Sequence, residues 1–166
     1  RGLGDVYKRQ LLEHTLGVTK LCDYYCSAYP ILQRDLLLTA AMRHDIGKVK
    51  EISAFPVNDY TDDGQLLGHI VMGAQMLGER AAKIDGFPHN LLAELQHCIL
   101  AHHGELEFGS PKKPAIAEAV ALSFADNIDA KMETVREIFN NVPENNQEWQ
   151  GYNRLLESNI RRSGKL

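Results

Sequence analysis

The segment His44-Asp45-Ile46-Gly47-Lys48 places an imidazole and a carboxylate next to each other, followed closely by a glycine and a lysine. Neighbouring residues lie about 100° apart around a helix, so both side chains reach one point only near a helix end. Gly47 predicts such an end, because glycine is favoured just beyond the last helical residue. A His-Asp pair alone is a weak motif, and its meaning depends on which residues the chain brings to it.

Four more histidines and a second aspartate accompany the pair at regular separations along the chain. The separations are 30, 24, 33 and 23 residues, counted from His14 to His44, Asp45 to His69, His69 to His102 and His103 to Asp126. Each is about one helix plus one connection, so successive helices can each bring a side chain to one central point. Mixed imidazole and carboxylate ligands suit Mn²⁺, Fe²⁺, Co²⁺, Ni²⁺ or Zn²⁺ better than Mg²⁺ or Ca²⁺. The series therefore predicts a centre for one or two divalent transition ions, with Mn²⁺ as our first choice.

The spacing of apolar residues predicts an all-α fold of about five main helices. The expected helices cover residues 10–28, 34–45, 65–84, 90–102 and 115–140, with proline or glycine between most of them. Residues 49–63 and 104–114 read as polar, turn-rich connections. Residues 149–160 form a short amphipathic segment whose type the pattern does not decide.

Each member of the series also has a plainer role when it is taken alone. His14 and His69 lie on otherwise apolar helix faces, where a hydrogen-bonded core histidine is commoner than a metal ligand. His102 and His103 are expected to end a helix, where a cation is favourable without any metal. A role without a metal explains the two aspartates less well. The carboxylate of the His-Asp pair would lie at the negative end of a helix dipole, which is unfavourable. Asp126 interrupts an apolar run, where a buried carboxylate without a partner is costly. The ordered set therefore predicts a metal centre more strongly than any member does.

Two histidines and three cysteines stay outside the series. His89 falls in a turn and His97 lies five residues before His102, so we expect both at the surface. The cysteines are odd in number and lack a Cys-x-x-Cys pair, which predicts reduced thiols in the core. They are Cys22, Cys26 and Cys98.

Composition is that of a compact domain. A chain of 166 residues with 44% hydrophobic content can bury one sizeable core. The formal charge of −4 gives no overall attraction to nucleic acid. No apolar run approaches the roughly 20 residues that span a bilayer, and no signal-peptide pattern is present. We therefore expect a cytoplasmic protein without a membrane partner.

The series, completed by Gly47 and Lys48, resembles the HD superfamily of metal-dependent phosphohydrolases. Four further strings make it similar to the HD-domain 3′→5′ exoribonucleases of the YhaM type. These strings are GQLLGH at 64–69, AHHGE at 101–105, GSPKKP at 109–114 and ADNIDAK at 125–131. The resemblance runs from about Leu11 to about Arg162, and it implies a helical HD bundle around a metal centre over 11–162. Members of that family carry an OB-fold module ahead of this domain, so we expect this chain to correspond to the catalytic half only.

The two ends of the chain are expected to lie outside the domain. Residues 1–10 (RGLGDVYKRQ) begin without methionine and do not share the pattern that follows. They are similar to translated adapter-derived stretches, so we expect them to be non-native. Residues 163–166 are expected to be frayed or truncated.

The resemblance also implies how the series divides between two ions. The first ion would be held by His14, His44, Asp45 and Asp126. Asp45 would bridge to a second ion held by His69 and His102. Two ions a few ångström apart lower the pKa of a water between them and clamp phosphate oxygens, so that hydroxide can attack phosphorus.

Three further roles are expected from the basic residues near the series. Lys48 would neutralise charge that develops on the phosphoryl group, although a helix-end cation explains it equally well on the residues alone. His103 would protonate the departing oxygen or orient the phosphate. Lys112–Lys113 and Arg161–Arg162 are candidates for a substrate path, with a solvated basic pair as the commoner explanation.

The expected activity is hydrolysis of phosphodiester bonds, with release of nucleoside 5′-monophosphates from the 3′ end of single-stranded RNA. The choice of RNA over single-stranded DNA rests on the resemblance, because no residue here reads a base or a 2′-hydroxyl. Three alternatives stay open: a hydrolase of small nucleotides or cyclic dinucleotides, a di-iron oxygenase on the same ligands, and a non-catalytic nucleic-acid-binding module. The Gly-Tyr-Pro element of the cyclic-dinucleotide branch is absent after His103-Gly104. The sequence leaves open the identity of the metal, the direction of degradation and whether the protein forms a homo-oligomer.

Overall fold

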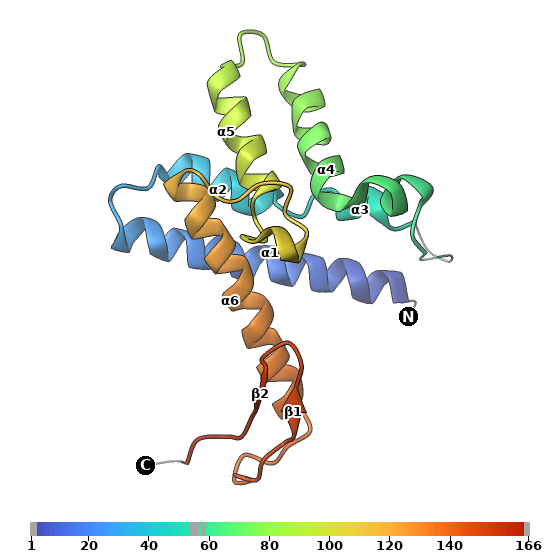
Figure 1. Ribbon diagram of the computed structural model, residues 1–166, viewed down its shortest axis with the longest axis vertical. Helices are drawn as coiled ribbons and strands as arrows, with labels where there is room; N and C mark the ends of the chain where they lie inside the picture. Colours follow the sequence, from blue (N-terminus) through green and yellow to red (C-terminus); the bar gives the residue numbers. More distant parts are fainter. Residues whose placement is uncertain (1–2, 54–56, 58, 165–166) are drawn as a thin grey trace. The chain divides into compact units, whose positions relative to one another are not determined.

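A computed structural model of the chain describes residues 3–53, 57 and 59–164. Five main helices carry the fold: α1 (Leu3–Ala28), α2 (Arg34–Arg43), α4 (Asp62–Ala81), α5 (His89–Leu100) and α6 (Ala117–Phe139). Shorter elements are α3 (Lys48–Glu51), the 3₁₀ turn η1 (Leu106–Phe108) and the strands β1 (Tyr152–Asn153) and β2 (Ser158–Asn159). The prediction of a helical protein with five main helices is confirmed (Figure 1).

The chain divides into two compact units, one over residues 1–126 and one over 127–166, and α6 runs through both. In the first unit α1 packs on α2, α2 on α5, α5 on α4 and α4 on α3. Figure 1 shows α4 and α5 side by side, joined by the turn at 82–88. No helix in the described part of the chain is long and apolar enough to cross a membrane.

The core of the first unit is built from one face of each packed helix. Its fully buried side chains include Val18 and Cys22 of α1, Leu37 of α2, Cys98 of α5 and Leu122 of α6. Burying each large aliphatic side chain stabilises the fold by about 1.5–3 kcal/mol. The thiols of Cys22 and Cys98 are therefore core groups, as predicted, while Cys26 is partly buried.

One carboxylate is also buried beside this core. Glu118, at the start of α6, accepts a hydrogen bond from the backbone N–H of Gln33 at 2.7 Å. Gln33 is the residue that caps α2, so the carboxylate lies at the positive end of that helix. This placement gives a buried charge a partner.

Helix α4 starts earlier than the predicted residue 65, and the expected turn around Asp62 and Asp63 is wrong. Thr61 caps the helix by accepting a hydrogen bond from the N–H of Gly64 at 3.0 Å. The two aspartates then occupy the first turn, where negative charge complements the helix dipole. Inside α4, Gly68 has φ 71° and ψ 160°, so the helix breaks there and restarts at His69.

The His-Asp segment differs from its prediction in two ways. Helix α2 ends at Arg43 rather than at Asp45, and the four-residue α3 follows within the predicted connection. Gly47 has φ −61° and ψ −27°, so it is not a left-handed helix cap. Glycine is required there because a Cβ would lie 1.9 Å from the carbonyl oxygen of His69. Gly47 lets the His-Asp turn approach the backbone of α4.

The second unit ends in a small hairpin, which decides the segment whose type the sequence left open. Strand β1 pairs antiparallel with β2, with Tyr152 opposite Asn159. The guanidinium of Arg162 donates to the carbonyl oxygens of Phe139 and Val142 at 2.9 and 3.2 Å, and it stacks on the Phe139 ring. Arg162 therefore ties the hairpin to the end of α6.

Candidate metal centre

The first group of side chains in the series lies where α1, the turn after α2 and α6 meet. Nε2 of His14 donates to Oδ1 of Asp126 at 2.9 Å, and it lies 3.3 Å from Nε2 of His44. His44 is fully buried, and its Nδ1 donates to the carbonyl oxygen of Ala41 at 2.7 Å. Because a carbonyl only accepts, the Nδ1 of His44 carries the proton and its Nε2 presents a lone pair. We call His14, His44 and Asp126 the His14 cluster.

The second group comes from α4 and from the turn after α5, which ends at Leu100 rather than at the predicted His102. Ring nitrogens of His69, His102 and His103 lie within 4.8 Å of one another. Nδ1 of His102 donates to the carbonyl oxygen of Ile99 at 2.7 Å, and Nδ1 of His103 donates to that of Phe108 at 2.8 Å. Both rings are therefore anchored through Nδ1, which leaves Nε2 as the available nitrogen. We call these three histidines the His69 cluster.

Asp45 lies between the two clusters and offers one oxygen to each. Its Oδ1 lies 3.5 Å from Nε2 of His69 and 3.7 Å from Nε2 of His102. Its Oδ2 lies 3.4 Å from Nε2 of His44 and 3.8 Å from Nε2 of His14. All six side chains that the sequence proposed as ligands therefore lie close together, and all six belong to the first unit. The structure adds His103 to the second group.

Three buried atoms in this centre have no hydrogen-bond partner among the described residues: Oδ1 of Asp45, Nε2 of His69 and Nε2 of His102. An unsatisfied buried polar atom costs about 1–3 kcal/mol. The two nitrogens have their lone pairs toward one carboxylate oxygen, and no proton lies between them. A cation would satisfy all three atoms, and a nitrogen-and-oxygen set of this kind fits a divalent transition ion.

The electrostatics keep these groups in the protonation states that metal binding needs. Burial raises the pKa of Asp45, but the proximity of His44 and the charge of Lys48 outweigh it, so the net pKa lies far below its usual range. Burial, reinforced by His44 and His103, lowers the pKa of His102 to about 3. Burial also lowers the pKa of His69, against the effect of Asp45. At neutral pH Asp45 is therefore a carboxylate, and the imidazoles of His69 and His102 are neutral.

Lys48 contacts the centre directly. Its Nζ donates to Oδ2 of Asp45 at 2.6 Å, and its side chain is 26% exposed. A pocket of about 170 Å³ opens beside this pair and is lined by Gln10, Leu11, His14, Asp45 and Lys48. The ammonium group therefore lies at the entrance to the buried carboxylate.

Sequence reasoning missed one residue of this centre. Glu51, only 8% exposed, accepts hydrogen bonds at Oε1 from the backbone N–H of His69 at 3.0 Å and from its Nδ1 at 3.2 Å. The sequence placed Glu51 in a polar connection. No spacing signal marks it, because the two residues meet only through the break at Gly68.

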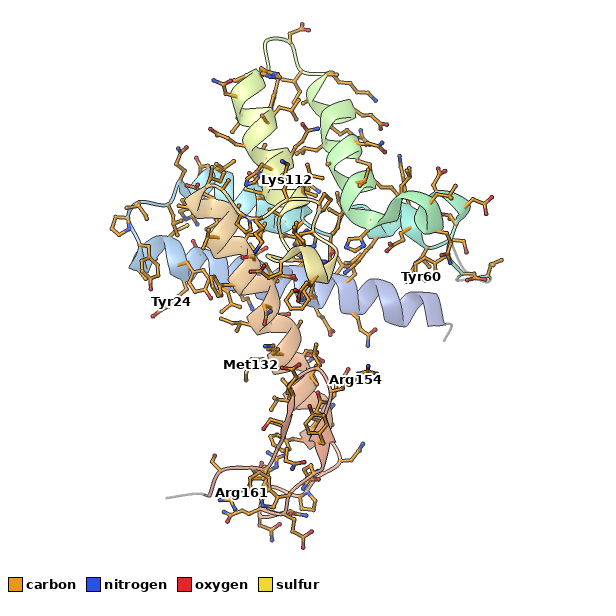
Figure 2. The ribbon with its side chains drawn as sticks, viewed as in Figure 1. Tyr24, Tyr60, Lys112, Met132, Arg154 and Arg161 are labelled. Carbon is orange, nitrogen blue, oxygen red and sulfur yellow. The ribbon has the colours of Figure 1, made fainter. Side chains whose placement is uncertain are left out.

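Other predicted residues take simpler places. Lys113 pairs with Glu105 at 2.7 Å, with both side chains more than half exposed, and Lys112, labelled in Figure 2, is exposed. His89 is exposed, as expected, but it begins α5 instead of lying in a turn. The expectation for His97 is wrong in part: it is half-buried, and its Nε2 accepts a hydrogen bond from the N–H of Ala115 at 2.9 Å.

Comparison with known proteins adds a family to this geometry. The family model described as the HD domain matches residues 11–131. The chain is 43% identical over 122 residues to the 3′-5′ exoribonuclease YhaM of Bacillus subtilis (strain 168), which covers 74% of this chain and 38% of that protein. It is 42% identical over 127 residues to the 3′-5′ exoribonuclease YhaM of Geobacillus sp. (strain WCH70), which covers 75% of this chain.

The chain spans 38% of the length of these relatives. No solved structure matches it.

Proposed function

This chain belongs to the HD-domain family, and on that premise we propose that it is a metal-dependent phosphodiesterase. Its proposed substrate is single-stranded RNA, from which it removes nucleoside 5′-monophosphates at the 3′ end. The substrate is supported by relatives that carry the name 3′-5′ exoribonuclease. The reaction class is supported by the geometry of the centre.

One observation carries the reaction class: a single buried carboxylate faces two clusters with different oxygens, and three unsatisfied atoms converge between them. In our proposal Asp45 and the His14 cluster would hold one ion, and Asp45, His69 and His102 would hold the second. Two such ions would supply a water of lowered pKa and positive charge that neutralises phosphate oxygens.

Two further side chains act on the substrate in this proposal. Lys48 is anchored on Asp45 and stabilises negative charge that develops on the phosphoryl oxygens. His103 is anchored through Nδ1, so its Nε2 would donate a proton to the departing oxygen when the ring is an imidazolium, or would serve as a third nitrogen ligand when the ring is neutral. The metal content of His103→Ala separates these roles, because only a ligand variant loses an ion.

The size of the pocket favours a polymer end over a small enclosed nucleotide. Its volume of about 170 Å³ is below the roughly 300–1,000 Å³ typical of sites that enclose a whole ligand. A phosphodiester group can enter such a space while the rest of the strand stays outside. Because the chain has a net charge of −4, we expect it to cleave short oligoribonucleotides but to bind long RNA weakly.

The test uses single-stranded RNA labelled at its 5′ end, a DNA of the same sequence and a circular form of the RNA, each with Mn²⁺. We expect a ladder that shortens from the 3′ end of the linear RNA, with 5′-monophosphates as products and no cleavage of the circle. Asp45→Ala should be inactive in the same assay. Cleavage of the circular RNA would overturn the exonuclease assignment, and hydrolysis of only mononucleotides or cyclic dinucleotides would overturn the RNA assignment.

A further inference from the structure

We propose that Glu51 is a positioning residue for the His69 cluster: its carboxylate holds the ring of His69 so that Nε2 faces Asp45, and it thereby sets the affinity of that half of the centre. This inference rests on the proposed metal-dependent function. It concerns a residue that touches no reacting atom and that acts through His69.

The backbone makes this contact possible. Gly68 takes φ 71° and ψ 160°, a conformation that favours glycine, so the helix is interrupted just before His69. The N–H of His69 then begins a new helical stretch, where the first N–H groups have no partner within the helix. Oε1 of Glu51 accepts that N–H at 3.0 Å. The carboxylate therefore caps the restarted helix at its positive end.

The same oxygen also determines the state of the His69 ring. It lies 3.2 Å from Nδ1, and an ionised carboxylate can only accept, so the proton resides on Nδ1. Nε2 is left with its lone pair, 3.5 Å from Oδ1 of Asp45 and with no hydrogen-bond partner among the described residues. A carboxylate behind a ligand histidine fixes its tautomer and orientation and raises its basicity.

The partner of His69 differs in kind from the partners of the neighbouring rings. The Nδ1 atoms of His44, His102 and His103 donate to neutral backbone carbonyl oxygens at 2.7 to 2.8 Å. Nδ1 of His69 instead meets a carboxylate at 3.2 Å, so its partner carries a charge that a backbone carbonyl lacks. The charge of Glu51 would also offset part of the positive charge that ions bring into the centre.

The main chain of Glu51 is held without help from its carboxylate. Its carbonyl oxygen accepts hydrogen bonds from the N–H and the hydroxyl of Thr61 at 2.9 and 3.3 Å. Gly64 packs so closely on this residue that a Cβ would lie 2.4 Å from the same oxygen. Because these contacts join α3 to α4, we expect substitutions of the side chain to leave the fold in place.

A purely structural role predicts a different result for Glu51→Gln. Glutamine keeps an oxygen that can accept from the N–H of His69, so a helix cap would survive the substitution. It loses the charge that fixes and polarises the ring. Glu118→Gln is the matched control, because Glu118 is also a buried carboxylate that accepts from a backbone N–H at the start of a helix.

The experiment measures Mn²⁺ binding by calorimetry on protein freed of metal with a chelator, together with thermal unfolding of the metal-free forms. The parent should bind two ions. Glu51→Gln should keep one at the parental affinity and bind the other about 10- to 100-fold more weakly. Its metal-free melting temperature should match that of the parent, and Glu118→Gln should bind both ions normally. In electron paramagnetic resonance, the signal of coupled Mn²⁺ pairs should give way to that of single ions in Glu51→Gln.

Parental affinity for both ions in Glu51→Gln would overturn the proposal and reduce Glu51 to a helix cap. Equal weakening of both ions would also overturn it, because the contact is specific to His69. A parent protein that binds no ion would overturn this inference and the proposed metal centre together. A parent that binds two ions but cleaves no phosphodiester would overturn the proposed function alone, and the binding data on Glu51→Gln would still decide the inference.

Discussion

The His14 cluster and the His69 cluster contain similar donors but differ in how those donors are satisfied. In the His14 cluster, a proton lies between Nε2 of His14 and Oδ1 of Asp126, which are hydrogen-bonded at 2.9 Å. In the His69 cluster, Nε2 of His69 and of His102 are buried without a hydrogen-bond partner among the described residues. We call the His14 cluster the closed half of the centre, because its histidine and carboxylate already satisfy each other. We call the His69 cluster the open half, because two of its nitrogens lack a hydrogen-bond partner in the described part of the chain.

The difference shows that the folded protein can hold ligand atoms unsatisfied before a metal ion binds. In the His14 cluster an ion must displace a hydrogen bond between a histidine and a carboxylate, which contributes about 1.5–3 kcal/mol. In the His69 cluster the unfavourable burial of the nitrogens is already part of the folded state. Their rings are anchored from behind by Ile99 and by Glu51. We therefore expect the open half to gain more stability from its ion than the closed half.

The largest effect is expected from the residue that the two halves share. Asp45→Ala removes the oxygens that face both clusters, so it should lose both ions and lower turnover by more than about 10³-fold, beyond the 10- to 100-fold typical of an outer-shell partner. Metal analysis after mild dialysis and a turnover assay check this. Asp35→Ala, at an exposed aspartate of α2, is the control. Full metal content in Asp45→Ala would show that the carboxylate bridges nothing.

Substituting one histidine from each cluster separates the two halves. His14→Ala and His69→Ala should each retain one ion, and the double variant should retain none, because each ring belongs to one cluster. Turnover should fall by at least about 10²-fold in each single variant. Calorimetry with Mn²⁺ counts the ions. Loss of both ions in either single variant would mean that the halves do not bind independently.

Lys48 tests whether a residue on the Oδ2 side of Asp45 acts in catalysis rather than in metal binding. Lys48→Ala should leave the metal content intact and lower turnover by about 10²-fold, as expected for one positioned charge donor. Lys50→Ala, at an exposed lysine of the same short helix, should match the parent. If Lys48→Ala turns over like the parent, Lys48 is only the ion-pair partner of Asp45.

Gly47 tests how the two halves are brought within reach of each other. A Cβ at Gly47 would lie 1.9 Å from the carbonyl oxygen of His69, so Gly47→Ala must push the His-Asp turn away from α4. We expect a loss of about 1–3 kcal/mol in the free energy of unfolding and weaker binding at the His69 cluster. Gly78→Ala is the control, because its Cβ would meet only the end of the Gln96 side chain. Urea unfolding that gives the same stability for Gly47→Ala and the parent would rule out the steric role.

The smallest effect is expected on the free energy of unfolding, through two thiols in the core that packs beside both halves. Burial, reinforced by Cys26, raises the pKa of Cys22 to about 12, and burial, reinforced by Glu118, raises that of Cys98 to about 12. Their ordinary pKa is near 9, so above that pH the unfolded chain releases protons that the folded chain retains. The free energy of unfolding should therefore fall as pH rises from about 9 towards 12, by about 1 kcal/mol per thiol between about pH 8 and pH 10.

Urea unfolding of the parent, Cys22→Ala and Cys98→Ala at the two pH values measures this slope. Cys22 lies on the helix that carries His14, and Cys98 lies on the helix that leads to His102. Equal contributions from the two thiols would show that both halves share one cooperative core. If the free energy of unfolding falls with pH as steeply in both variants as in the parent, the two thiols are not the cause of the pH dependence.

The sequence by itself determined the features that depend on local pattern. Apolar periodicity predicted the five main helices, because a helix is specified by neighbours three and four positions apart. Four of them lie within a few residues of their predicted bounds, but α1 begins at Leu3 rather than at the predicted residue 10. The ordered histidines and aspartates indicated the type of donors and the family. They did so because one donor per helix can be recognised without knowing how the helices pack.

Only the tertiary structure decided which donors meet and in what state. His14 and Asp126 are 112 residues apart and share a hydrogen bond, while the Nε2 of His69 has no hydrogen-bond partner among the described residues. Glu51 joins the centre because Gly68 interrupts a helix, and Gly47 serves close packing rather than a helix end. These contacts depend on the non-local packing of backbones, which a pattern along the chain does not contain.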